Sequence, residues 1–170
     1  MNKKARIFAI IFGVASLAWL IFIFANSMKN GQESGQMSGS VTEAINDVIH
    51  TVAPSVSVSH LFVRKSAHFC EFALFSLLLC FSFWFEIFGA RAKRSLRAAL
   101  TVSALAFGGS VLAASADETI QLFVDGRAGS VVDVCIDSAG ALLAALAFFA
   151  LLCWKGFKVK KDRENGKDHD

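Results

Sequence analysis

Four long apolar segments alternate with short polar ones along this chain, and this pattern sets the fold prediction. A helix needs about 20 apolar residues to cross the hydrocarbon core of a bilayer. The segments of this length are residues 7–25, 67–88, 96–116 and 130–154. The first could be a signal peptide, but its apolar run is long and Phe24 stands where cleavage needs a small residue, so we interpret it as an uncleaved span. The pattern predicts an all-α integral membrane protein, a bundle of four transmembrane helices.

The polar segment between the first two spans, residues 26–66, contains a further helix pattern. Residues 30–40 are rich in Gly, Ser and Gln, which is typical of a mobile stretch. Ser40 and Glu43 then form a capping-box pattern, and Pro54 ends the helical segment. Apolar residues follow at helical spacing: Val41, Ile45, Val48, Ile49 and Val52. We expect a short amphipathic helix in the outer interface or over the bundle, with an ordinary surface helix as the alternative.

Basic residues flank the spans unequally, and this asymmetry predicts the orientation. One set of flanks carries Lys3, Lys4, Arg6, Arg91, Lys93, Arg94, Arg97, Lys155, Lys158, Lys160, Lys161, Arg163 and Lys167. The opposite flanks carry only Lys29, Arg64, Lys65 and Arg127. Because Lys and Arg concentrate on the cytoplasmic side, both termini are expected in the cytoplasm. We therefore expect a transmembrane domain over residues 1–157 and a charged cytoplasmic tail over residues 158–170.

Composition narrows the function classes. Hydrophobic residues make up 55% of the chain and charged residues 18%, with 17 phenylalanines, which suits a lipid-facing surface better than a soluble core. No basic patch with interleaved aromatic residues indicates a nucleic-acid partner. The cysteines, Cys70, Cys80, Cys135 and Cys153, form no CxxC pair and lie in apolar runs. We interpret them as small buried residues, not as a disulfide or a zinc site.

Ionisable side chains near the spans are predicted to gather in one outer layer. Arg64, His68 and Glu71 are spaced to share one face of a helix, and Asp133 and Asp137 share a face of another. The full set of candidate binding residues is Arg64, Lys65, His68, Glu71, Asp117, Glu118, Gln121, Arg127, Ser130, Asp133 and Asp137. Burying such groups is costly unless they are paired or reach water. The layer is either a packing network between helices or a pocket, and convergence from three helices favours a pocket.

The deepest acids, Asp133 and Asp137, are expected to need partners, and several chemistries stay open. The available cations are Arg64, Arg127 and His68. The arginines and Lys65 suit an anionic head group. Alternatively, the candidate catalytic residues His68, Glu71, Asp117 and Glu118, together with Asp133, suit metal-assisted hydrolysis. A third chemistry is acid–base catalysis between His68 and Glu71 or Asp117.

We expect no metal and no cofactor, although Mg²⁺ or Mn²⁺ is an alternative to that expectation. A single histidine among these residues argues against tight zinc binding. The other histidines, His50, His60 and His169, are interpreted as surface residues. Neither GxSxG, nor a P-loop, nor HExxH occurs in the sequence.

Several motifs together resemble the VanZ-like family of bacterial membrane proteins. The stretch "RKSAHFCEFALFSLLL" contains a K-x-x-H-x-x-E element, Lys65, His68 and Glu71. The stretch "SADETIQLFVDGRAGSVVDVCIDSAGALL" contains a D-E-x-x-Q element, a G-R-x-G-S turn and a D-x-x-x-N-x-x-G-like helix start. The polar stretch "NSMKNGQESGQMS" also resembles the family's loop, so the resemblance covers about residues 22–152. Two positions depart from the family pattern: Ile120 replaces a frequent histidine, and Asp137 replaces a usual asparagine.

The resemblance implies a multi-pass protein of the bacterial cytoplasmic membrane and no settled reaction. The family's namesake is linked to resistance to the glycopeptide antibiotic teicoplanin. Three interpretations follow. The first is a pocket for an anionic envelope lipid, a lipid-linked precursor or a lipoglycopeptide. The second is a membrane enzyme that acts on an envelope-lipid phosphate or ester. The third is a scaffold or accessory subunit with a protein partner.

Overall fold

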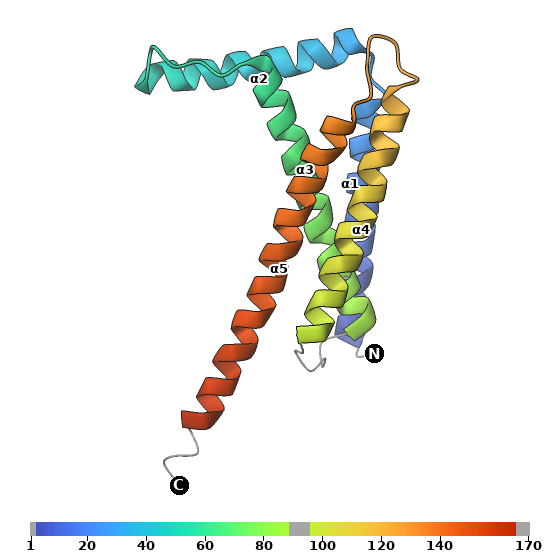
Figure 1. Cartoon of the computed structure of the whole chain (residues 1–170), viewed down its shortest axis with the longest axis vertical. Helices are drawn as coiled ribbons and strands as arrows, with labels where there is room; N and C mark the ends of the chain where they lie inside the picture. The colour runs from blue at the N-terminus through green and yellow to red at the C-terminus, as the bar shows by residue number, and fades with distance from the viewer. Residues whose placement is uncertain (1–2, 89–95, 166–170) are drawn as a thin grey trace.

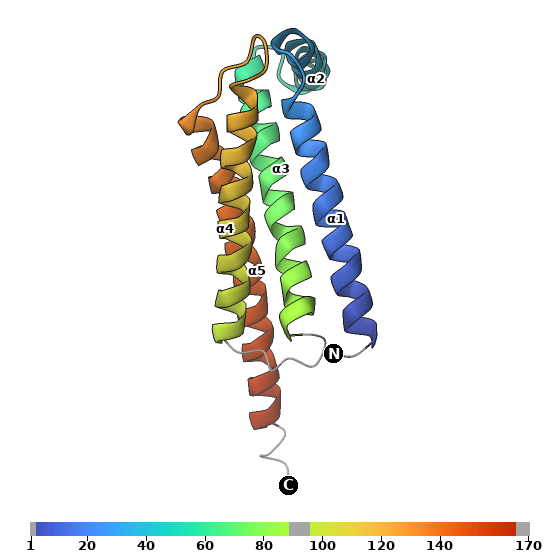
Figure 2. The same cartoon turned by 90° about the vertical axis from the view of Figure 1, so that its right-hand side faces the viewer.

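The computed structural model describes residues 3–88 and 96–165, and these residues form helices joined by turns. In chain order the elements are α1 (Lys3–Ser27), α2 (Gly31–Val52), α3 (His60–Phe83), its π-helical continuation η1 (Trp84–Phe88), α4 (Leu96–Gln121) and α5 (Val131–Asn165). Helices α1, α3, α4 and α5 stand side by side, and α2 lies across one end of the bundle (Figures 1 and 2). The segments long and apolar enough to cross a membrane are Lys3–Ser27, His60–Ile87, Leu96–Gln121 and Val131–Trp154. The predicted four-span, all-α fold is confirmed.

The helices extend beyond the predicted limits of the spans, and two of these extensions, in α3 and α4, bring charged candidate residues into helices. Helix α3 begins at His60, not near residue 67, because the Ser59 hydroxyl accepts a hydrogen bond from the Phe62 amide at 3.3 Å and caps the helix. Helix α4 continues to Gln121, one turn past residue 116. Hydropathy alone hides both extensions, since charged side chains occupy those turns.

Helix α2 is longer than predicted at its N-terminus. The expectations of a mobile stretch over residues 30–40 and of a helix start at Ser40 are wrong. Asn30 is the N-cap, and its side-chain oxygen accepts a hydrogen bond from the Glu33 amide at 2.9 Å. The helix ends at Val52, before Pro54, as expected. Its predicted apolar face is exposed, with Val48 68% accessible, which suits a helix that lies in an interface.

The helix ends divide the basic residues as the sequence suggested. Lys4, Arg6 and Arg97 lie at the end of the bundle where α1 and α4 begin, and Arg64 and Arg127 lie toward the end covered by α2 (Figure 2). Five further residues of the sequence analysis, Arg91, Lys93, Arg94, Lys167 and His169, lie outside the described residues. The topology is therefore compatible with termini on one side of a membrane.

The end of the bundle away from α2 is held together by apolar side chains, and we call it the apolar end. Its buried cluster consists of Cys80, Trp84, Ala98, Val102, Ala106, Ala145 and Phe148. The ring of Phe148 meets Phe81 edge-on, with centroids 5.2 Å apart. A second cluster continues the core toward the middle of the bundle: Ile23, Phe72, Phe75, Ala113, Ala114 and Ala141.

A glycine allows α5 to contact α3 backbone to backbone. A Cβ atom at Gly140 would overlap the carbonyl oxygen of Phe69, so a larger residue would push the helices apart. His68 precedes Phe69 in α3, and Asp137 lies one turn before Gly140 in α5. The close approach at this glycine therefore brings His68 and Asp137 together.

Candidate functional site

All the candidate residues lie at the end of the bundle that α2 covers, and we call this the polar end. Helix α3 contributes Arg64, Lys65, His68 and Glu71; α4 contributes Asp117, Glu118 and Gln121; the α4–α5 turn contributes Arg127 and Ser130; α5 contributes Asp133 and Asp137. The side chains of Asp117, Gln121 and Asp137 are fully buried, and Glu118 is 5% exposed. The predicted gathering of charge from three helices is thus present in the fold.

Asp133 was expected among the deepest acids, but its side chain is 29% exposed, and its partner is a lysine that was not among the expected cations. Lys65 of α3 donates a hydrogen bond to, and forms an ion pair with, Asp133 of α5. Both side chains are about one-third exposed, at 35% and 29%. Arg64 and Arg127 form no ion pair with a carboxylate within the described residues. Helix register explains the difference, because α3 and α5 are packed directly against each other.

A hydrogen-bonded network links α1 to α4. The Ser27 hydroxyl donates to Asp117 Oδ2 at 2.7 Å. The Gln121 amide nitrogen lies 3.0 Å from the same carboxylate oxygen and 3.2 Å from Glu118 Oε1. Each of these side chains is at most 5% exposed. The network supplies hydrogen-bond partners to some of the buried polar groups at this end, and it fixes how α1 packs against α4.

Glu118 also holds the start of α5. Its Oε2 accepts a hydrogen bond from the Ser130 backbone amide at 2.8 Å. The turn before Ser130 contains Gly126, whose φ of 71° lies in the left-handed region that glycine adopts readily. The Gly31 amide at the start of α2 donates to the Asp125 carbonyl in this turn at 3.0 Å. The turn is therefore anchored both to α4 and to α2.

Arg127 reaches from this turn toward α2 and donates a hydrogen bond to the Ser34 hydroxyl. Its Nε is buried and has no hydrogen-bond partner among the described residues. Burial lowers the pKa of this guanidinium, and the charge of Arg64 lowers it further, whereas Asp117 and Glu118 raise it. Arginine nevertheless stays protonated in proteins. The polar end thus holds a partly buried cation with donor capacity to spare.

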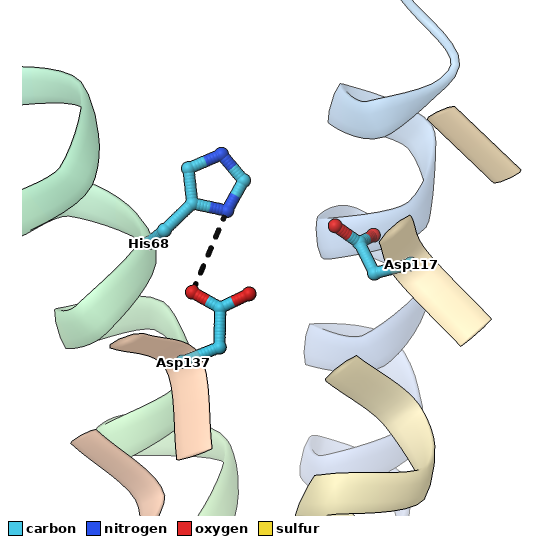
Figure 3. Close-up of side chains that lie close together, drawn as sticks. All are labelled: His68, Asp117 and Asp137. Atoms are coloured by element: carbon cyan, nitrogen blue, oxygen red, sulfur yellow. Dashed lines mark ion pairs between the residues drawn. The ribbon is translucent and has the colours of Figure 1, made fainter. Parts of the chain in front are cut away.

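His68, Asp117 and Asp137 approach one another from three different helices (Figure 3). One ligand-type atom from each lies within 4.8 Å of the others. His68 Nδ1 is 3.9 Å from Asp137 Oδ1, which is too long for a hydrogen bond. The described residues offer no hydrogen-bond partner to His68 Nδ1, Asp117 Oδ1 or either oxygen of Asp137. These atoms are positioned to accept a ligand, a proton or a cation.

Two small cavities flank this group. One of about 90 Å³ is bounded by α3, α4 and α5, and its lining includes Lys65, His68, Glu118 and Asp137. The other, about 80 Å³, is bounded by α1, α2, α3 and the turn, and its lining includes Glu71 and Arg127. Arg64 and His68 line both. The two spaces are therefore adjacent, on either side of one face of α3.

Three residues of the polar end were missed by the sequence analysis as site residues. Ser27 bonds Asp117, Ser34 bonds Arg127, and the Trp19 ring nitrogen donates to the Glu71 carbonyl at 2.9 Å. The polar pair Asn26–Ser27 at the end of the first apolar run was a usable signal for Ser27. No pattern in the sequence indicated Ser34, because residues 30–40 were expected to be mobile.

The histidines that were interpreted as surface residues are exposed where the structure describes them. His50 and His60 are exposed, with contacts to the Ser57 hydroxyl and the Gly35 carbonyl at 3.1 Å each. Cys80 is buried in the bundle and Cys153 is partly buried, whereas Cys70 and Cys135 are exposed on the surface of the chain; all four are free thiols in the described structure.

Comparison with known proteins gives one match. The sequence model of the family described as VanZ/LLP1 matches residues 12–153, most of the chain. No curated protein matches significantly, and no solved structure does. The matched range contains every residue of the polar end named above.

Proposed function

Because the chain belongs to the VanZ/LLP1 family, we propose that this VanZ-like membrane protein binds the anionic head group of a lipid-linked molecule at its polar end. The shared chemistry is a phosphate or carboxylate beside an acyl or prenyl chain. An envelope phospholipid, a lipid-linked envelope precursor and a lipoglycopeptide antibiotic of the teicoplanin type all carry it. The adjacent exposed apolar surface of the bundle would accommodate the chain.

One observation carries this proposal: Arg64 and Arg127 line the same cavity, of about 80 Å³, without a carboxylate ion pair among the described residues. The planar guanidinium group offers five donors in a geometry that fits phosphate and carboxylate oxygens. A cation held purely for packing would normally be paired with an acid when buried. Here Lys65 is paired with Asp133, and both line the adjoining cavity of about 90 Å³. The two arginines are left for a ligand.

The direction in which this site faces is part of the proposal. The basic flanks at the opposite end of the bundle favour a cytoplasmic location for the termini. The polar end then lies at the outer face of the cytoplasmic membrane, where envelope lipids and their precursors are exposed. Helix α2, with its exposed apolar face, would lie in the outer interface beside the entrance.

Native mass spectrometry of the protein extracted gently from its membrane tests this function. Arg127→Ala removes the charge and the hydrogen bond to Ser34, whereas the matched control Ser34→Ala removes only the hydrogen bond. We expect the wild type and Ser34→Ala to carry the same co-purifying anionic lipid and Arg127→Ala to lose it. If all three proteins carry no lipid, or all carry it equally, the head-group site is contradicted.

A membrane enzyme that cleaves a phosphate or ester of the bound lipid is a second candidate. It is favoured by the position of His68, whose Nδ1 faces the buried carboxylate of Asp137 at 3.9 Å. A histidine oriented by a carboxylate is a common general base. This candidate predicts turnover of the co-purified lipid that falls at least about 100-fold in His68→Ala while lipid binding persists. Equal turnover in the wild type and in His68→Ala would exclude this enzymatic function.

A further inference from the structure

The cluster of His68, Asp117 and Asp137 has the composition and geometry of a small cation site. Each residue comes from a different helix, α3, α4 and α5 respectively, so the cluster exists only in the folded bundle (Figure 3). One donor atom from each lies within 4.8 Å of the others. Three ligand atoms about 2.1 Å from a common metal ion are about 3.0–3.6 Å from one another. Side-chain rotations that bring the donors about 1 Å closer together would therefore close them around one ion.

The carboxylate oxygens of this cluster are buried without partners. Asp137 is fully buried, and neither of its oxygens accepts a hydrogen bond from any described residue. Asp117 is also fully buried and uses only Oδ2, in the bonds to Ser27 and Gln121. Its Oδ1 has no partner within the described chain. Buried carboxylates in this condition are stable only if something supplies positive charge or donors.

The charge balance of the polar end points the same way. Among the candidate binding residues of this end, the carboxyl groups are Glu71, Asp117, Glu118, Asp133 and Asp137, and the fixed cations are Arg64, Lys65 and Arg127. Lys65 is already engaged by Asp133. Arg127 turns toward Ser34 of α2, and Arg64 forms no ion pair within the described part of the chain. The net excess of two acids matches one divalent cation.

We propose that His68 Nδ1, Asp117 Oδ1 and an Asp137 oxygen form a binding site for one divalent cation of the Mn²⁺ type. Two carboxylates favour a hard ion with oxygen ligands, and a single imidazole nitrogen is compatible with manganese. The single histidine still argues against a tight structural zinc site. The adjoining cavity of about 90 Å³, which His68 and Asp137 line, leaves room for water as further ligands.

This cation site goes beyond the proposed head-group function and does not depend on it. The donors of the cation site come from α3, α4 and α5, whereas Arg127 lies in the α4–α5 turn and reaches α2. A cation can therefore bind in the absence of lipid, and a lipid head group can bind Arg127 in the absence of a cation. Where both are present, the ion would attract the same anionic head group.

Mn²⁺ binding to the full-length protein in a neutral detergent tests the site. The protein is stripped with EDTA and titrated with Mn²⁺, and free Mn²⁺ is followed by electron paramagnetic resonance. We expect one bound ion per chain in the wild type. Asp137→Asn and His68→Gln should each weaken binding roughly tenfold or more, as loss of a ligand does. Asp47→Asn, which changes an exposed acid on α2, is the matched control and should bind as the wild type does.

The two ligand variants keep the test decisive if one of them misfolds. Circular dichroism and size-exclusion profiles identify folded variants, and His68 is the less buried of the two positions, with a side chain 19% exposed. A folded His68→Gln protein that binds Mn²⁺ as tightly as the wild type overturns the proposal. A wild-type protein that binds no Mn²⁺ also overturns it. So does an Asp47→Asn protein whose affinity for Mn²⁺ falls as much as that of the two ligand variants. Failure of this titration leaves the Arg127 lipid experiment unaffected, so the two proposals are separately refutable.

Discussion

The two ends of the bundle use the same three helices for different purposes. At the apolar end, α3, α4 and α5 meet through Cys80, Val102, Phe148 and small residues, and Ser103 is a buried polar side chain beside them. At the polar end the same helices bury Asp117, Glu118, Gln121 and Asp137. Several of these groups lack hydrogen-bond partners within the described structure. Among the described residues, the unpartnered buried carboxylate oxygens lie at the polar end, whereas the apolar end has an unpartnered serine hydroxyl, that of Ser103.

This difference indicates that the apolar end provides stability and that the polar end is available for function. Unsatisfied buried polar groups are destabilising, and native proteins keep them mainly at functional sites. A bundle with a closed apolar end can tolerate a strained polar end, because the helices are already fixed relative to one another. The following variants test that division, from the largest expected effect to the smallest.

Gly140→Leu should have the largest effect, because it acts on the contact that joins the two ends. Its side chain would collide with the Phe69 backbone and separate α5 from α3. We expect a loss of unfolding free energy of more than about 3 kcal/mol, above the usual range for overpacking, since backbone must move. Unfolding in a mixed-detergent titration measures it.

Gly108→Leu is the matched control, because a Cβ at Gly108 meets nothing within 4 Å. We expect that variant to unfold as the wild type does. Equal losses in the two glycine variants would show that the contact with Phe69 is not responsible, because leucine has a higher helix propensity than glycine and propensity alone would stabilise both.

Phe148→Ala should weaken the apolar end by about 3 kcal/mol, since it removes a buried ring and leaves a cavity between α3 and α5. Lipid and Mn²⁺ binding by the folded fraction should be unchanged. Leu143→Ala, at a position 58% exposed on the same helix, should cost much less. A Phe148→Ala protein of full stability that loses ligand would reverse the assignment of the two ends.

Gln121→Ala should cost about 1–2 kcal/mol, because it removes a donor from Asp117 and from Glu118 and leaves both carboxylates less satisfied. Thermal unfolding in detergent measures this loss. The exposed residue Gln32 on α2 provides the control Gln32→Ala, for which no loss is expected. An equal effect at both positions would refute a structural role of the network.

Lys65→Met should have the smallest effect on stability, at most about 1 kcal/mol, because the pair with Asp133 is about one-third exposed and screened by water. A double-mutant cycle with Asp133→Ala isolates the pair. A coupling energy above about 2 kcal/mol would instead make this pair a main clamp between α3 and α5.

The fold could be predicted from the sequence because membrane-spanning helices have a strong length and hydropathy signal. The same signal fails at helix ends, where charged residues such as Arg64 and Glu118 continue a helix that hydropathy would stop. Helix α2 was misjudged for a related reason. Its first half is polar and glycine-rich, but the cap by Asn30 and the anchor between Gly31 and Asp125 stabilise it in tertiary context.

The site could be predicted in composition but not in pairing. Topology alone gathered the charged residues, and helical spacing put His68 and Glu71 on one face. Which cation meets which acid depends on helix rotation and depth, which a single sequence does not encode locally. Lys65 therefore replaced the expected arginines as the partner of Asp133, and Ser27 entered the network without having been singled out.

The unfolding free energy of Asp137→Leu, compared with that of the wild type in metal-free detergent, tests the central claim most directly. Leucine has the branched shape of aspartate without its charge, and Asp137 is fully buried with no hydrogen-bond partner for its oxygens in the described structure. If the polar end is a ligand site, the variant should be as stable as the wild type or more stable, because removing unpaired buried charge is neutral or favourable. It should also lose Mn²⁺ binding. A loss of more than about 1 kcal/mol of stability would show that Asp137 holds the helices together, and the charged layer would then be a packing device.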